Sequence, residues 1–267
     1  LSNREVQHRF LIRLRAILPE RCTPIIIADS GFRVPFYRHV ESLGWHWLGR
    51  IRGRDFIAWQ TDHAGWFPAK TLYQQANGHP TRLGEALWDR SSPLAACLYL
   101  VRQPKRGRHA ISSAGIRQHS KHSKKNAKRE NEPWLLVASP TLKNFCARRV
   151  VNLYKTRMQI EENFRDTKSA SYGLGIAREN RTTLTRASNL LLIAALASMV
   201  LWANGTFALQ QKLEHLVIGH SSSKRPCHSA IYIARLLMKY VRMKLPASCL
   251  TQTQRLIRSY NERLLYA

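Results

Sequence analysis

The stretch Leu153–Lys168, LYKTRMQIEENFRDTK, carries four side chains of complementary chemistry at helical spacing. They are Tyr154, Arg157, Glu161 and Lys168, separated by three, four and seven residues. Because an α-helix turns once in about 3.6 residues, these intervals place all four on one stripe of a predicted helix. A carboxylate beside a guanidinium, an ammonium and a phenol suits a site that holds a metal ion and orients phosphates. The alternative is a solvated helix face, on which Arg157 and Glu161 form only an ion pair of about 0.2–0.5 kcal/mol.

The same intervals belong to a longer pattern, Y-x2-R-x3-E-x6-K followed by Ser-Ala-Ser-Tyr-Gly-Leu-Gly. This pattern resembles the signature of bacterial DDE transposases of the IS-four family, the cut-and-paste enzymes of insertion sequences. The resemblance extends from the first residues to about Trp202. It implies that Glu161 is a metal ligand, and that Tyr154, Arg157 and Lys168 grip the phosphate next to a base flipped from the DNA end.

The resemblance also implies an α/β fold, with an RNase H-like catalytic core, a β-rich insertion and an α-helical C-terminal region. The first strands of that core are absent from the sequence, so the core is expected to be incomplete. The expected ranges are 1–54 for the core with the second Asp, 55–140 for the insertion, 141–203 for the core helices with the signature, and 204–267 for the C-terminal helices.

The composition is strongly basic, with 43 Lys and Arg against 16 Asp and Glu and a formal net charge of +27. This excess is beyond what solubility needs and indicates a polyanionic partner, by default nucleic acid. Charge alone does not separate an enzyme from a ribosomal or membrane-surface protein. The five cysteines are far apart and lack a C-x2-C pair, so neither a disulfide framework nor a zinc site is predicted.

Asp29 ends a short apolar run, Ile25–Ala28, that is typical of a buried strand. A helix is expected before it, over Asn3–Leu18, and another after it, over Val34–Leu43. Ligands of α/β sheets gather at the carboxyl ends of strands, but an Asp before Gly is also common in turns. The segment Ala-Asp-Ser-Gly-Phe resembles the second acidic block of these transposases, which implies that Asp29 is a metal ligand.

Trp45–Arg52 alternates as a strand, with Trp45, Trp47 and Ile51 predicted on one face and His46, Leu48, Arg50 and Arg52 on the other. Arg50 and Arg52 are able to contact phosphates, and a solvated edge face is an equal alternative. Further strands are expected at Phe56–Trp59, Trp66–Phe67, Ala95–Val101 and Trp134–Ala138.

The segment Gln103–Arg129 holds nine Lys and Arg and no acidic residue. It is predicted to be a basic loop that condenses on DNA phosphates, with a solvated tract as the alternative. Trp134 follows it, twenty residues before Tyr154. Most tryptophans pack in cores, but the family resemblance implies that Trp134 stacks on the flipped base, an interaction worth roughly 1–3 kcal/mol.

One continuous helix is expected over Asn144–Lys168 and a second over Leu184–Ala203. The apolar run Leu190–Ala203 is shorter than the ~20 residues that a membrane-spanning helix needs, so it is predicted to be a buried helix that covers the sheet. Basic helices are expected beyond it, over Phe207–Ile218, Ala230–Leu245 and Gln252–Leu265. The protein is expected in the bacterial cytoplasm, associated with the nucleoid.

The family resemblance implies a chemistry in which three carboxylates hold two Mg²⁺ ions to hydrolyse and rejoin DNA. Mn²⁺ can substitute for Mg²⁺. Asp29 and Glu161 are the expected second and third carboxylates. The first is expected on an upstream strand, whereas only Glu5 and Glu20 precede Asp29. The partners implied are double-stranded DNA, as terminal inverted repeats and target, and a second copy of the chain.

Two other functions remain open on the sequence. One is a catalytically inactive DNA-binding remnant that inhibits an intact transposase through mixed complexes. The other is a basic structural or RNA-binding protein. The last account explains the charge but leaves Asp29 and the helical stripe to chance.

Overall fold

The computed structural model describes residues 3–61, 65–104, 116, 120, 121, 131–169, 171–175, 183–218 and 228–241, together with 251, 252, 254–256, 258 and 259. It divides into two compact units, Leu1–Arg157 and Met158–Ala267. Most of the predicted basic loop 103–129 and most of the predicted helix 252–265 lie outside the described residues.

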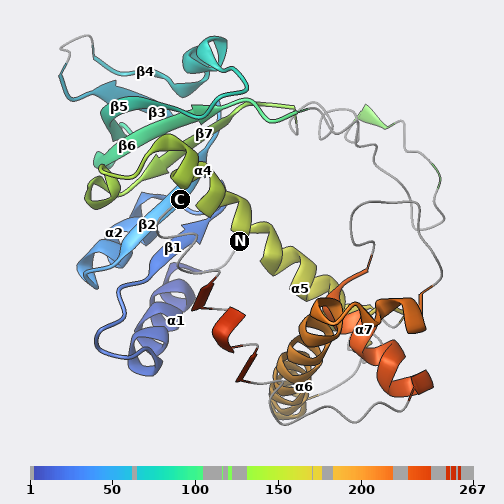
Figure 1. Ribbon diagram of the computed structural model, residues 1–267. Helices are drawn as coiled ribbons and strands as arrows, with labels where there is room; N and C mark the ends of the chain where they lie inside the picture. The colour runs from blue at the N-terminus through green and yellow to red at the C-terminus, as the bar shows by residue number, and fades with distance from the viewer. Residues whose placement is uncertain are drawn as a thin grey trace. The chain divides into compact units, whose positions relative to one another are not determined.

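The first unit is built on a mixed seven-stranded sheet in the order β1-β2-β7-β6-β5-β3-β4 (Figure 1). β1 pairs with β2 in parallel, and all the other neighbours are antiparallel. β1 therefore lies at one edge of the sheet. The strands are β1 (Ile25–Ala28), β2 (His46–Ile51), β3 (Phe56–Trp59), β4 (Phe67–Pro68), β5 (Thr81–Trp88), β6 (Leu94–Val101) and β7 (Trp134–Ala138).

The first two helices confirm the sequence expectation. α1 (Arg4–Ile17) begins where the Asn3 side chain accepts a hydrogen bond from the Glu5 amide, and it ends before Pro19. α2 (Val34–Ser42) connects the parallel strands β1 and β2 and ends at Gly44, whose φ of 75° favours glycine. The two helices pack on each other and contribute to the same apolar cluster.

The two faces of the sheet form separate apolar clusters. One cluster takes Trp47 and Ile51 from β2 together with side chains of α1 and α2. The other takes Leu48 together with side chains of β6, β7 and α4 (Ala147–Thr156). The predicted alternation of β2 is thus confirmed, and it places α4 on the face opposite α1 and α2.

β5 was absent from the predicted strands. Its alternation is interrupted by a register shift between Arg82 and Gly84, where Gly84 has a φ of 138°. A β-bulge of this kind removes the period of two by which a strand is recognised. The strands predicted within 55–140 are otherwise found within one residue of their expected bounds, and they continue the same sheet as β1 and β2.

The predicted single helix Asn144–Lys168 is wrong in one respect, because it is divided at Arg157 into α4 and α5 (Met158–Lys168). The Thr156 hydroxyl donates to the Leu153 carbonyl at 2.7 Å, and this carbonyl is the normal acceptor for the Arg157 amide. The Arg157 amide instead donates to the Tyr154 carbonyl at 3.2 Å. The interruption of the helical hydrogen bonding thus coincides with a side-chain hydrogen bond to the Leu153 carbonyl.

The second unit contains α5, α6 (Leu184–Gln210), α7 (Ala230–Leu236), the 3-10 turn η4 (Leu213–Leu216) and the π-helical turn η5 (Leu237–Val241). α6 packs against α7 and continues through Gly205, where a Cβ atom would overlap the Ala230 carbonyl. Gly205 permits close helix packing and does not end the helix.

The prediction that Leu190–Ala203 is buried is wrong for most of its side chains. Leu192 and Ile193 are 61% and 62% exposed, while Ala194 and Leu201 are buried. In the described part of the chain, α6 is the one helix that is long enough and apolar enough to cross a membrane. Core helices of soluble proteins also meet this criterion. Small residues of α6 face α7, and most of its large apolar residues do not.

Candidate functional site

Asp29 follows β1 directly and is exposed. Its carboxylate is therefore accessible to a ligand, while the adjoining strand holds its backbone rigidly. One carboxylate oxygen accepts a hydrogen bond from the Gly31 amide at 2.8 Å. A Cβ atom on residue 31 would lie 2.9 Å from that oxygen, so a larger residue there would displace the Asp29 carboxylate. Asp29 is therefore turn-forming, as the alternative proposed, and it is also presented at the edge where ligands of α/β sheets gather.

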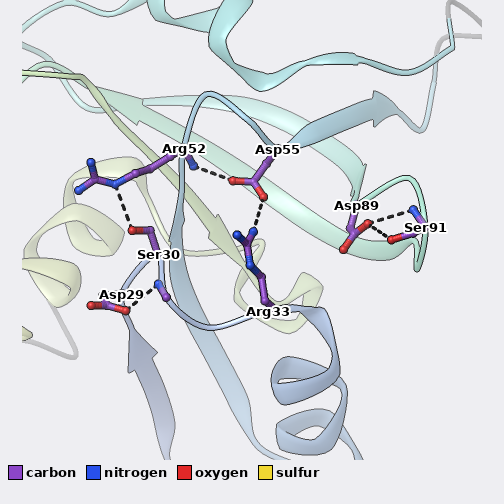
Figure 2. A network of polar contacts seen from close by, with 8 residues as sticks. Asp29, Ser30, Arg33, Arg52, Asp55, Asp89 and Ser91 are labelled. Carbon is purple, nitrogen blue, oxygen red and sulfur yellow. Dashed lines mark hydrogen bonds and ion pairs between the residues drawn. The ribbon is translucent and has the colours of Figure 1, made fainter. Parts of the chain in front are cut away.

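A network of polar contacts joins the turn after β1 to the turn after β2 (Figure 2). The Arg52 Nε atom donates to the Ser30 hydroxyl at 3.1 Å, and the Arg52 amide donates to Asp55 at 2.9 Å. Asp55 also pairs with Arg33 at 2.9 Å. Parallel pairing brings the carboxyl ends of β1 and β2 to the same side of the sheet, the edge that is formed by strand ends. These contacts therefore fix the backbone next to Asp29 at that edge.

The start of β7 lies at the same edge, because β7 runs antiparallel to β2 with Leu135 opposite Ile51. The Arg52 guanidinium lies 3.5 Å from the Glu132 carboxylate. The Arg50 guanidinium donates to the carbonyls of Glu132 and Pro133 at 3.3 and 3.4 Å. The alternative of a solvated face does not hold for Arg50 and Arg52, and their contact with phosphates stays a prediction.

Trp134 begins β7 and packs against the cluster that contains α4. Its ring meets the Tyr154 ring edge-on, with 5.1 Å between the ring centres. The Arg50 guanidinium carbon lies 5.8 Å from the Trp134 ring centre, and the Arg157 guanidinium carbon lies 5.9 Å from the Tyr154 ring centre. Core packing of Trp134 is thus present, while stacking on a flipped base stays a prediction.

Burial raises the pKa of the Tyr154 phenol, and the Arg157 and Arg50 cations oppose that rise. The Asp29 carboxylate raises this pKa further, which shows that the phenol and the carboxylate lie within electrostatic range of each other. Burial also lowers the pKa of Arg50, with a contribution from the Arg52 cation. At neutral pH the Tyr154 hydroxyl is therefore a protonated donor among guanidinium cations.

The structure brings Asp29, Trp134, Tyr154 and Arg157 together in the first unit. Glu161 and Lys168 belong to α5 in the second unit and are both exposed. The Lys168 ammonium lies 5.6 Å from the Phe164 ring centre. The roles predicted for Glu161 and Lys168 stay predictions.

Glu132 and Ser30 were not singled out by sequence reasoning. Ser30 follows Asp29 directly in the sequence, and this adjacency is the signal by which it could have been found. Glu132 reaches the edge only through the antiparallel pairing of β2 with β7, which no local pattern in the sequence indicates.

Across the described ranges, no three His, Cys, Asp or Glu residues lie close enough together to hold one ion. Asp29 offers one accessible carboxylate, and Asp55 is already engaged by Arg33 and by the Arg52 amide. The donors gathered at this edge do not by themselves fit a two-ion centre, which needs several carboxylates.

The sequence was also compared with known proteins. A family model described as the transposase DDE domain matches residues 3–200 of the 267-residue chain. No curated protein matches the chain. The matched span includes every residue of the edge described above, and also Glu161 and Lys168.

Proposed function

Because the chain belongs to the family of DDE transposases, we propose that it is the transposase of a bacterial insertion sequence of the IS-four family, close to that of insertion sequence ten. Membership implies an RNase H-like fold, with which the mixed sheet and its helices agree. In this proposal the chain binds terminal inverted repeats and target DNA as a homodimer. It performs cut-and-paste transposition in the cytoplasm, on nucleoid DNA.

The observation that carries the proposal is the grouping of Asp29, Trp134, Tyr154 and Arg157 at one sheet edge. A guanidinium and a protonated phenol both donate to phosphate oxygens, and a tryptophan provides a surface for base stacking. Arg157 and Tyr154 would hold the phosphate next to the flipped base, with Lys168 adding charge. Trp134 would receive the base.

DDE transposases normally use divalent metal ions, and we propose Mg²⁺ here. Asp29 and Glu161 would supply two of the carboxylates, and the bound ions would activate the nucleophile and stabilise the leaving oxygen. A third carboxylate is needed. Glu5 lies on α1 and Glu20 in the turn after it, and neither is on a strand.

The described residues gather no group of three metal-binding side chains, which favours a second candidate function, in which the chain binds transposon ends without cutting them. Such a chain would inhibit an intact transposase by forming mixed complexes. The two candidates share the phosphate contacts of Tyr154 and Arg157 and differ only in cleavage.

Cleavage and binding are separable by experiment on a labelled duplex that carries the terminal repeat of the element encoding the chain. Arg157→Ala is expected to weaken binding by about tenfold or more, since a charge-assisted contact is lost. Asp29→Asn is expected to spare binding and to abolish any cleavage with Mg²⁺ or Mn²⁺. Lys155→Ala, a nearby exposed cation, is the matched control.

Cleavage by the wild-type chain that Asp29→Asn removes would establish the transposase activity. Binding without cleavage, with inhibition of an intact transposase, would favour the second candidate. Wild-type affinity in Arg157→Ala, or the absence of any binding to the repeat, would contradict the proposed site.

A further inference from the structure

The second unit contains a hollow of about 530 Å³ between α6 and the segment formed by α7 and η5. Its lining combines aromatic and cationic side chains, including Tyr232, Arg235, Lys239 and Tyr240, with Leu201 at its apolar side. The volume falls within the range of about 300–1,000 Å³ that small-molecule sites occupy. None of the predicted DNA contacts of the family signature lies in it.

The cations of the hollow are positioned by the protein. The Arg235 guanidinium donates to the Ser171 carbonyl at 3.3 Å, which uses one of its five N–H donors. The Lys239 ammonium lies 4.9 Å from the Tyr240 ring centre. Among the described residues that line the hollow, Arg235 and Lys239 are cationic and none is acidic. The local field therefore favours an anion.

The aromatic residues form a surface beside these cations. The Tyr232 ring lies between His228, at 4.9 Å between ring centres, and Tyr172, at 5.2 Å. Tyr240 is 66% exposed, so its ring is accessible to a ligand. An exposed aromatic ring next to cations is the combination that binds a base and its phosphate in single-stranded nucleic acids.

We propose that this hollow binds a nucleotide of single-stranded DNA, with the base on Tyr240 and the phosphate on Lys239 and Arg235. A duplex does not offer the same fit, because its bases are stacked on one another and their faces are not accessible to an aromatic ring. The proposal rests on the proposed function in that DNA is the ligand, but it is independent of cleavage. The strand bound would be an unpaired segment next to a transposon end.

The test measures the binding of the full chain to a labelled oligothymidine strand and to a blunt duplex of equal length, by fluorescence anisotropy. Tyr240→Ala is expected to weaken single-strand binding by about tenfold, and Tyr240→Phe, which keeps the ring, by less than about twofold. Lys239→Gln is expected to reduce the slope of log affinity against log salt by about 0.7. Duplex binding is expected to stay unchanged in all three variants.

Single-strand affinity that is the same in Tyr240→Ala and Lys239→Gln as in the wild type would overturn the proposal. An equal loss on the duplex would overturn its preference for single strands. Photo-cross-linking of a bromodeoxyuridine strand is expected to map to Tyr240, and cross-links confined to the first unit would contradict it. The proposed function is tested separately, by the effect of Arg157→Ala on binding to the terminal-repeat duplex. Failure of the proposed function and failure of the single-strand site are therefore distinguishable.

Discussion

Gly49 is the residue of β2 that lies beneath the buried Tyr37 ring. A Cβ atom at this position would overlap the Tyr37 hydroxyl oxygen, and Tyr37 has no exposed surface through which to withdraw. Gly49 is also paired with Ala28, the residue before Asp29. Glycine here allows α2 to pack closely on the strand pair that presents the carboxylate.

We predict that Gly49→Ala destabilises the first unit by about 1–3 kcal/mol, the usual cost of overpacking a core. Urea denaturation measures the loss. Gly78→Ala is the matched control, because a Cβ atom there meets no atom within 4 Å. Equal stability of the two variants would show that the α2–β2 contact relaxes without cost.

The Tyr154 phenol is expected to contribute to a pH dependence of stability. Its pKa is raised in the folded chain, above all by burial, from an ordinary value of about 10. The folded state therefore binds the phenolic proton more tightly than the unfolded state. This contribution is complete below pH ~10 and is lost as the pH rises through the folded pKa.

Denaturation at a series of alkaline pH values provides the measurement. Tyr154→Phe is expected to lose stability less steeply above pH ~10 than the wild type does, because the variant has no phenol to ionise. Parallel curves for the two proteins would contradict the role assigned to burial at this position.

Among the candidate site residues, the place of Asp29 at the end of a strand could be predicted because its signal is local: a short apolar run ends and an acidic residue follows. Arg50 and Arg52 could be placed on one strand face for the same reason. Their partner Glu132 could not, since its position depends on which strands pair and no local pattern specifies that β7 lies beside β2. Local periodicity identifies candidates, and the pairing of distant strands decides which of them meet.

At the scale of elements, the interruption between α4 and α5 depends on one hydroxyl group. Thr156→Ala frees the Leu153 carbonyl to accept the Arg157 amide, so we predict slower hydrogen exchange at Arg157. A gain of about 0.3–0.7 kcal/mol is expected from the higher helix propensity of alanine. Amide exchange followed by nuclear magnetic resonance measures the first effect.

The control for this variant is Thr206→Ala. The Thr206 hydroxyl also donates to a carbonyl of its own helix, that of Trp202 at 2.7 Å, and α6 continues past it to Gln210. Unchanged exchange at Arg157 in Thr156→Ala would mean that the hydroxyl accompanies the interruption without causing it.

The elements that could be predicted are those with unbroken periodicity, such as α1, β2 and β7. β5 was not predicted because its bulge at Gly84 breaks the alternation of apolar and polar residues. The exposure of α6 could not be predicted for a different reason. Apolar composition shows that burial is favourable, but it does not show which partner covers the helix.

At the scale of the whole molecule, the net charge of +27 is expected to dominate binding to nucleic acid. Each phosphate that a cation neutralises releases condensed counterions, so affinity for duplex DNA falls with salt. We predict a steep linear decline, with a loss of roughly 10³–10⁵ in affinity between 50 and 200 mM salt if six to ten phosphates are contacted. Anisotropy titrations over this range measure the slope, and a flat response would exclude an electrostatic footprint of that size.

β1 lies at the edge of the sheet and, within the described residues, pairs only with β2. An unpaired strand edge accepts a further strand through backbone hydrogen bonds alone. A strand added there would run beside Ile25–Ala28 and would bring its own side chains next to Asp29.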